Sequence, residues 1–119
     1  MANNSVALSA NGGYELVTAA GTTLAAATPL PGAFNYVTSA TSQTGVILPA
    51  TNGPGVQIVV NVTAGSSASA VVYPPSAAAQ INGGTAGAGV TVAAGKSAIF
   101  WPVNSSQAAA PQWIAISGA

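Results

Sequence analysis

The chain contains almost no ionisable side chains. Among its 119 residues Glu15 and Lys96 are the only charged ones, and histidine and cysteine are absent. General acid–base catalysis needs at least one positioned titratable group, usually a histidine or one of a pair of carboxylates. Glu15 and Lys96 lie far apart in the sequence, and no further group is present to orient either of them. The composition therefore argues against an enzyme and against a small-molecule substrate.

The same scarcity excludes most kinds of ligand site. Metal sites need clusters of Cys, His or carboxylate ligands, and nucleic-acid binding needs several Lys or Arg to neutralise phosphates. We therefore expect no metal, no cofactor and no nucleic-acid partner. No apolar run approaches the roughly 20 residues of a membrane helix, so membrane insertion is not expected. Without cysteine there is also no disulfide framework.

The residues that are present favour self-association. Half of the chain (50%) is hydrophobic, but most of these residues are Ala and Val, with only two Trp, three Tyr and two Phe. Alanine has little area to bury, so the core gains little stability per residue. The net charge of zero also removes the repulsion that keeps free proteins apart. We expect the chain to bury further surface against copies of itself as a homo-oligomer.

The pattern of the chain predicts strands and almost no helix. Short runs rich in Val, Ile, Thr and aromatics are separated by Gly, Pro, Asn and Ser at roughly the 8–12-residue spacing of an all-β sandwich or barrel. The predicted strands are Phe34 to Ser39, Val46 to Leu48, Val56 to Val62, Ala70 to Tyr73, Val90 to Ala93, Ser97 to Val103 and Gln112 to Ile116. We predict an all-β fold, an antiparallel β-sandwich or jelly-roll-like barrel.

Details of two segments sharpen this prediction. Positions 56, 58, 60 and 62 are apolar, so one face of Val56 to Val62 is expected to be buried. In the last strand both alternating sets are apolar, which suits either a central strand or an oligomer interface. Asn-Gly at Asn82-Gly83 and Gly95 in Ala93 to Lys96 predict tight turns.

The first residues of the chain differ from the rest. Residues 1–13 are polar and rich in Gly and Asn, with weak strand character. We expect an extended N-terminal arm over residues 1–13 and a single β-sandwich domain over residues 14–119. A merely frayed terminus is the alternative.

An ordered series of short motifs lies between about Thr44 and Trp113: Gly45 to Ala50, Gly55, Val59 to Asn61, Val71 to Pro74, Ile81 to Gly83, Val92 to Ser97, Phe100 and Gln112-Trp113. This series resembles a small β-rich module of tailed-bacteriophage structural proteins, most of all the head decoration (cement) proteins. The resemblance implies a homotrimer on the outer surface of the capsid that contacts the major capsid protein and stabilises the shell.

Aromatic residues are the candidates for partner contacts, because Trp and Tyr dominate binding hot spots. The candidates are Tyr14, Tyr36, Phe100, Trp101 and Trp113. Core packing competes with this role for both tryptophans, above all for Trp113 in its apolar strand. Sugar stacking by the tyrosines is disfavoured, because no Asp, Arg or His stands beside them to bind hydroxyls.

Two other functions compete with the decoration role. A receptor-binding tip domain of a phage fibre or spike would also be β-rich and trimeric, although this chain shows no shaft repeats. An ice- or surface-binding protein would array threonines at a fixed solenoid period. The threonines of this chain are irregularly spaced, which argues against that class.

Overall fold

The computed structural model describes residues 14–39, 44–51, 57–105 and 107–117, and the predicted arm at residues 1–13 lies outside them. The described residues form β-strands with a single short 3-10 turn, η1 (Leu24–Ala26), so the all-β prediction is confirmed. The strands are β1 (Glu15–Thr18), β2 (Thr28–Pro29), β3 (Phe34–Thr38), β4 (Thr44–Ile47), β5 (Ile58–Val62), β6 (Ala70–Tyr73), β7 (Gln80–Ile81), β8 (Val90–Val92), β9 (Ser97–Pro102) and β10 (Gln112–Ser117).

Each strand predicted from the sequence is found, with ends that differ by at most two residues. The predicted strands do not include β1, β2 and β7. Two of these have only 2 residues each, and β2 includes Pro29. β1 starts at a glutamate, a residue depleted in strands. Such segments become strands because a neighbouring strand offers hydrogen-bond partners.

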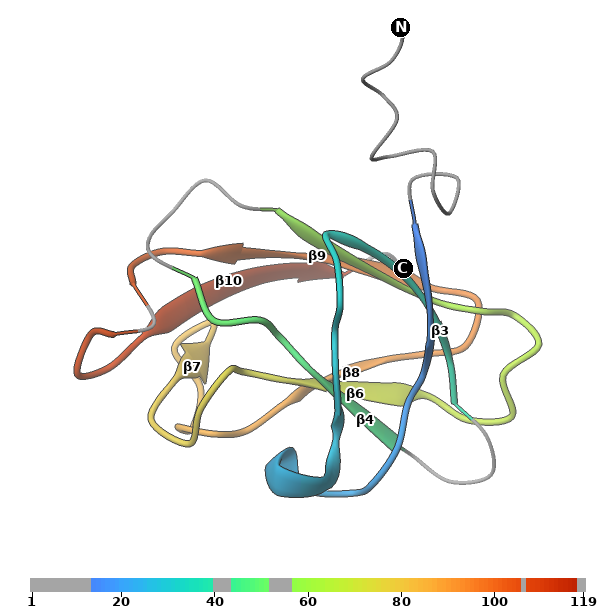
Figure 1. The fold of residues 1–119 in the computed structure, drawn as a ribbon, viewed down its shortest axis with the longest axis horizontal. Helices are drawn as coiled ribbons and strands as arrows, with labels where there is room; N and C mark the ends of the chain where they lie inside the picture. Colours follow the sequence, from blue (N-terminus) through green and yellow to red (C-terminus); the bar gives the residue numbers. More distant parts are fainter. Residues whose placement is uncertain (1–13, 40–43, 52–56, 106, 118–119) are drawn as a thin grey trace, which may run out of the picture.

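The strands form two sheets, and the chain alternates between them (Figure 1). The six-stranded sheet has the order β1-β3-β5-β9-β10-β7, and the four-stranded sheet has the order β2-β4-β6-β8. From β1 to β9, odd-numbered strands belong to the first sheet and even-numbered strands to the second. The chain therefore crosses to the opposite sheet at each of these connections.

This winding makes most strand pairs parallel, so the prediction of an antiparallel sheet is wrong for them. In the first turns of the coil, each strand that re-enters a sheet runs in the same direction as its predecessor, as in β1-β3-β5 and β2-β4-β6. β8 re-enters the four-stranded sheet antiparallel to β6. Among the described residues, five of the eight strand pairings are parallel, and the antiparallel ones are β5–β9, β9–β10 and β6–β8. An isolated antiparallel bridge also joins Ala20 to Gly45. Among the described strands, only β9 and β10 are both consecutive in the chain and paired with each other.

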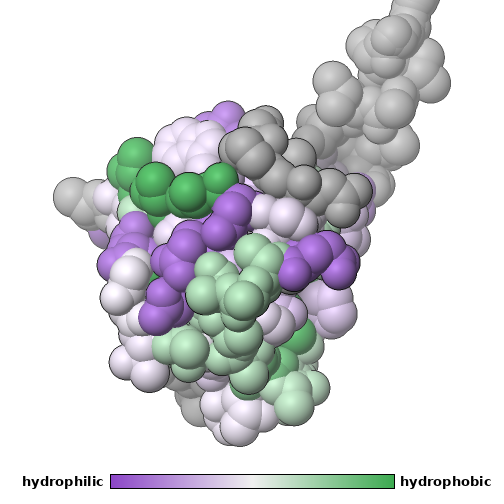
Figure 2. All heavy atoms as spheres, turned by 90° about the vertical axis from the view of Figure 1, so that its left-hand side faces the viewer, coloured by the Kyte–Doolittle hydropathy of each residue, from purple (hydrophilic) through white to green (hydrophobic). Residues whose placement is uncertain are grey.

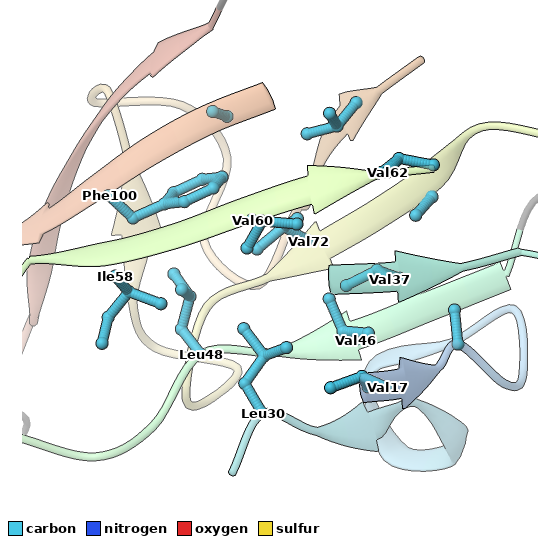
Figure 3. Close-up of a cluster of buried hydrophobic side chains, with 14 of the residues drawn as sticks. Val17, Leu30, Val37, Val46, Leu48, Ile58, Val60, Val62, Val72 and Phe100 are labelled. Atoms are coloured by element: carbon cyan, nitrogen blue, oxygen red, sulfur yellow. The ribbon is translucent and has the colours of Figure 1, made fainter. Parts of the chain in front are cut away.

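One hydrophobic core lies between the two sheets (Figure 3). In β5, buried Ile58, Val60 and Val62 alternate with half-buried residues, as the apolar alternation predicted. The core is built mostly from valine and alanine, and Phe100 and Trp113 are its largest side chains, at 0% and 2% exposure.

Both predicted tight turns are present. Asn82 and Gly83 have positive φ angles of 54° and 67°, and the Gly84 N–H donates to the Ile81 carbonyl at 3.0 Å. Gly95 has a φ of 79°, and the Lys96 N–H donates to the Ala93 carbonyl at 3.0 Å. The first turn follows β7, and the second leads from β8 in the four-stranded sheet to β9 in the six-stranded sheet.

A buried hydroxyl holds the end of β3 to the four-stranded sheet. Ser39 is fully buried, and its Oγ lies 2.6 Å from the Thr44 Oγ1 and donates to the Ser69 carbonyl at 3.0 Å. Because buried polar groups are costly without partners, these bonds stabilise the crossing from β3 to β4. They also hold the six-stranded sheet in a fixed place relative to the second sheet.

Candidate functional site

The six-stranded sheet carries an apolar surface on the side that faces away from the core. Strand alternation directs every second residue outward, and most of these outward residues are aliphatic or aromatic. We call this surface the apolar outer face. It consists of Tyr14, Leu16, Phe34, Tyr36, Val59, Ile99, Trp101, Ile114 and Ile116.

Strand register places these side chains next to one another across the sheet. Phe34 stands opposite Val59, which stands opposite Ile99, which stands opposite Ile116. This row crosses β3, β5, β9 and β10. Trp101 stands opposite Ile114, and Leu16 stands opposite Tyr36. The apolar outer face is therefore continuous from β1 to β10.

The exposure of these side chains is large for a soluble monomer. Leu16 is 74% exposed, Ile116 56%, Phe34 48%, Ile114 47%, Tyr36 42% and Tyr14 40%. At about 200 Å² for a large side chain, these six expose about 600 Å². Apolar patches above a few hundred Å² mark interaction sites on monomeric proteins.

Aromatic rings gather at the β1–β3 edge of this surface. The rings of Tyr14 and Tyr36 meet edge to face, with centroids 6.0 Å apart and an interplanar angle of 73°. Phe34 lies on the same outward side of β3 as Tyr36. An edge-to-face contact contributes about 1 kcal/mol beyond burial, so the two rings hold each other in place.

Polar side chains bound the apolar outer face along the strands, and they bind each other. At one end, the Asn61 Nδ2 donates to the Ser97 Oγ at 2.6 Å. At the other end, the Gln112 Nε2 donates to the Gln80 Oε1 at 2.7 Å. Figure 2 views the end of the molecule at the left of Figure 1, and it shows mostly hydrophilic and weakly hydrophobic residues with a strongly hydrophobic strip at the upper margin.

Neither charged residue belongs to this face. Glu15 lies on the opposite side of β1 from Leu16, with its Cγ close to Gly32. Lys96 is exposed in the turn between β8 and β9. The apolar outer face is therefore electrically neutral, and a charged partner surface would gain nothing from contact with it.

The four-stranded sheet presents a different outer side. Within the described residues, none of its large apolar side chains is as exposed as those of the apolar outer face. Tyr73 lies over Gly45, where a Cβ would come within 2.6 Å of the ring, and the Tyr73 Oη donates to the Thr22 carbonyl at 3.0 Å. The segment around η1 thus occupies part of this side. The exposed large apolar side chains of the described residues lie on or next to the six-stranded sheet, and Val103, just after β9, is one of them.

The structure divides the five candidate contact residues into two groups. Tyr14, Tyr36 and Trp101 lie on the apolar outer face, where a partner can reach them. Phe100 and Trp113 are buried in the core between the sheets, so they are removed from the candidate surface. Their burial follows from strand alternation, because each is next to an outward residue and therefore points inward.

Other members of the surface were not identified from the sequence. Leu16, Phe34, Ile114 and Ile116 are more than 40% exposed, and none is a Tyr or Trp. One signal in the sequence pointed to Ile114 and Ile116: both alternating sets of Gln112 to Ile116 are apolar, which is compatible with an oligomer interface. Leu16 had no such signal, because β1 was not recognised as a strand.

The described part of the chain holds no cluster of His, Cys, Asp or Glu that fits a metal ion. Nor does a helix long and apolar enough to span a membrane occur in that part. Comparison with protein-family models, curated proteins and solved structures found no match. The arguments about function therefore rest on the surface itself and on the composition of the chain.

Proposed function

We propose that this chain is a structural protein of a tailed-bacteriophage particle, a decoration (cement) protein that binds the outside of the head as a homotrimer. In this role it contacts the major capsid protein and stabilises the shell without catalysing a reaction. The proposal combines the resemblance of the motifs between Thr44 and Trp113 to phage modules with the properties of the surface. A β-sandwich formed by the two sheets is its proposed building unit.

The observation that carries the proposal is the neutral apolar outer face. A protein that works free in solution normally relies on surface charge for solubility, and this chain has one acidic and one basic residue. A permanent place in an assembly removes that need, because the exposed apolar surface is buried there. Each decoration subunit also has to stay bound at any ionic strength, and contacts without charges provide this property.

A receptor-binding tip of a fibre or spike is the second candidate. The specific observation in its favour is the exposed aromatic group formed by Tyr14, Phe34 and Tyr36. Aromatic rings offer flat apolar surfaces that can stack on sugar rings. The scarcity of charged side chains near these rings favours the decoration role, because Glu15, on the opposite side of β1, is the one charged group close to them in sequence and few groups are present to bind sugar hydroxyls.

Immunogold electron microscopy of phage particles that carry this chain tests the proposal. An antibody raised against the chain should label the whole surface of the heads at high density. Label confined to tails or fibres would contradict the decoration role and support the tip. Particles that lack the chain serve as the control for antibody specificity.

A further inference from the structure

We propose that the apolar outer face is the surface through which copies of this chain associate with one another. The inference deepens the proposed function and rests on it for the trimeric state, since it names the surface used within the homotrimer. The occupant of the face is a second copy of the chain rather than the capsid. Three arguments support this choice.

The first argument is area. Stable interfaces bury about 800 Å² on each partner, which is about a tenth of the surface of a small protein. The six most exposed residues of the face supply about 600 Å² at about 200 Å² for a large side chain. Half-buried Val59, Ile99 and Trp101 fill the area between them. The face therefore has about the area that one subunit buries in a standard interface.

The second argument is charge. Two copies of a typical protein surface bring like charges together, which opposes association and sets the orientation. Neither Glu15 nor Lys96 lies on the apolar outer face, so copies approach it without repulsion. The polar pairs at its ends, Asn61–Ser97 and Gln80–Gln112, are bonded within the chain. They need no partner from outside, and they limit the contact to the apolar rows.

The third argument is symmetry. A three-fold trimer uses heterologous contacts, in which one part of the face meets a different part of the same face on the next copy. A face that is apolar throughout suits such contacts, because no two parts of it repel each other. When three copies turn this face toward a common axis, each face meets the other two, and the row from Phe34 to Ile116 becomes buried. The four-stranded sheets then point outward and remain available for other contacts.

Ile116 is the position at which to test the inference. It is 56% exposed at the β10 end of the row and lies on the opposite side of β10 from the buried Trp113, so Ile116→Lys changes the surface without opening the core. Like charges brought together at the interface should raise the dissociation constant at least about 30-fold, the size of a hot-spot effect. Ile114→Thr is the second variant, because threonine keeps strand propensity and adds no charge.

Thr91→Lys is the matched control. Thr91 is exposed on β8 at the edge of the four-stranded sheet, and the substitution adds the same charge away from the apolar outer face. Circular dichroism and thermal unfolding of each variant verify that the fold is retained. The mass of each chain is then measured by sedimentation equilibrium over a range of concentrations.

The inference predicts an oligomer for the unmodified chain and for Thr91→Lys, with dissociation in Ile116→Lys and weaker association in Ile114→Thr. A specific interface is expected to have a dissociation constant of about 1 μM or below. An unmodified chain that is still monomeric at about 100 μM would therefore overturn the inference. Equal masses for the unmodified chain and Ile116→Lys would overturn it as well, because association would then use another surface.

Binding to undecorated heads, measured by co-sedimentation, separates this inference from the proposed function. An oligomer that depends on Ile116 but does not bind heads contradicts the decoration role and leaves the self-association surface intact. A monomer that binds heads, and loses that binding in Ile116→Lys, assigns the face to the capsid. That result overturns the inference and retains the decoration role.

Discussion

Asn82 shows how a single residue can replace part of a strand. β7 pairs with only the first residues of the longer β10, and the side chain of Asn82 continues the pairing. Its Oδ1 accepts from the Ala115 N–H at 2.9 Å, and its Nδ2 donates to the Ala115 carbonyl at 3.2 Å. Its backbone has a φ of 54°, a conformation that asparagine tolerates better than most residues.

Substitutions at Asn82 separate the two contributions. Asn82→Gly keeps the turn but loses both side-chain bonds, and should lower the free energy of unfolding by about 1 kcal/mol. Asn82→Ala adds the strain of a Cβ at positive φ, so it should be less stable than the glycine variant by about 1 kcal/mol. Urea unfolding at a fixed protein concentration measures both. Equal stability of the two variants would show that the turn imposes no strain.

Gly45 gives a second test at this scale. A Cβ at Gly45 would lie 2.6 Å from the Tyr73 Cε2 and 3.1 Å from the Ala27 Cβ. Gly45→Ala should therefore lower the free energy of unfolding by about 1–3 kcal/mol, as overpacking does. Gly65→Ala is the control, because a Cβ there meets nothing within 4 Å, and it should be neutral or slightly stabilising. A Gly45→Ala variant as stable as Gly65→Ala would mean that the Tyr73 ring moves aside freely.

At the scale of strands, the sequence predicted where most strands lie better than it predicted which strands pair and in which direction. Alternating apolar positions predicted the buried face of β5, because one buried face imposes a period of two whatever the partner strand. The direction of pairing depends on which sheet each connection reaches, and no local residue pattern encodes that. The buried positions of Phe100 and Trp113 follow from the same alternation, but the sequence does not show which of the two faces is inside. The exposure of Ile114 and Ile116 therefore cannot be predicted from the alternation alone.

Engineered disulfides test the parallel pairing of β1 with β3. The chain has no cysteine of its own, and Thr18 stands opposite Thr38 with both residues exposed. Thr18→Cys with Thr38→Cys should form an intrachain disulfide on oxidation, because neighbouring strands lie within the reach of this bond. Mass spectrometry under non-reducing conditions detects it. Ile116→Lys can be added to keep the chains apart during oxidation.

The matched pair is Thr18→Cys with Phe34→Cys. In the parallel register Phe34 lies four residues along β3 from Thr38, about 13 Å away, which is too far for a disulfide. An antiparallel arrangement would bring residues 18 and 34 together instead. Efficient cross-linking of the control pair and none of the first pair would therefore contradict the observed topology.

At the scale of the whole molecule, the two-sheet coil separates its surfaces by character. One sheet exposes a continuous apolar face, and the other has its large apolar side chains at least partly covered. The composition contains few charged residues, and this scarcity predicted that the chain associates without electrostatic contacts. It did not predict where that association takes place, because the location depends on the register of five strands from β1 to β10.

Salt dependence tests this description of the molecule. With one basic and one acidic residue, the chain has few charges that salt can screen. Raising sodium chloride from about 0.05 M to 0.5 M, which shortens the screening length about threefold, should leave the dissociation constant of the oligomer unchanged within about twofold. Sedimentation equilibrium at both concentrations measures it. A tenfold weakening would show that an ion pair holds the copies together.

The thermal stability of phage heads with and without this chain tests the central claim most directly. Undecorated heads are heated in a series of steps, with and without the purified chain, and the release of packaged DNA is followed by a dye. The account predicts that the chain shifts DNA release to higher temperature, with saturation once all sites on the head are filled. Release at the same temperature with and without bound chain would contradict the claim that the protein stabilises the shell.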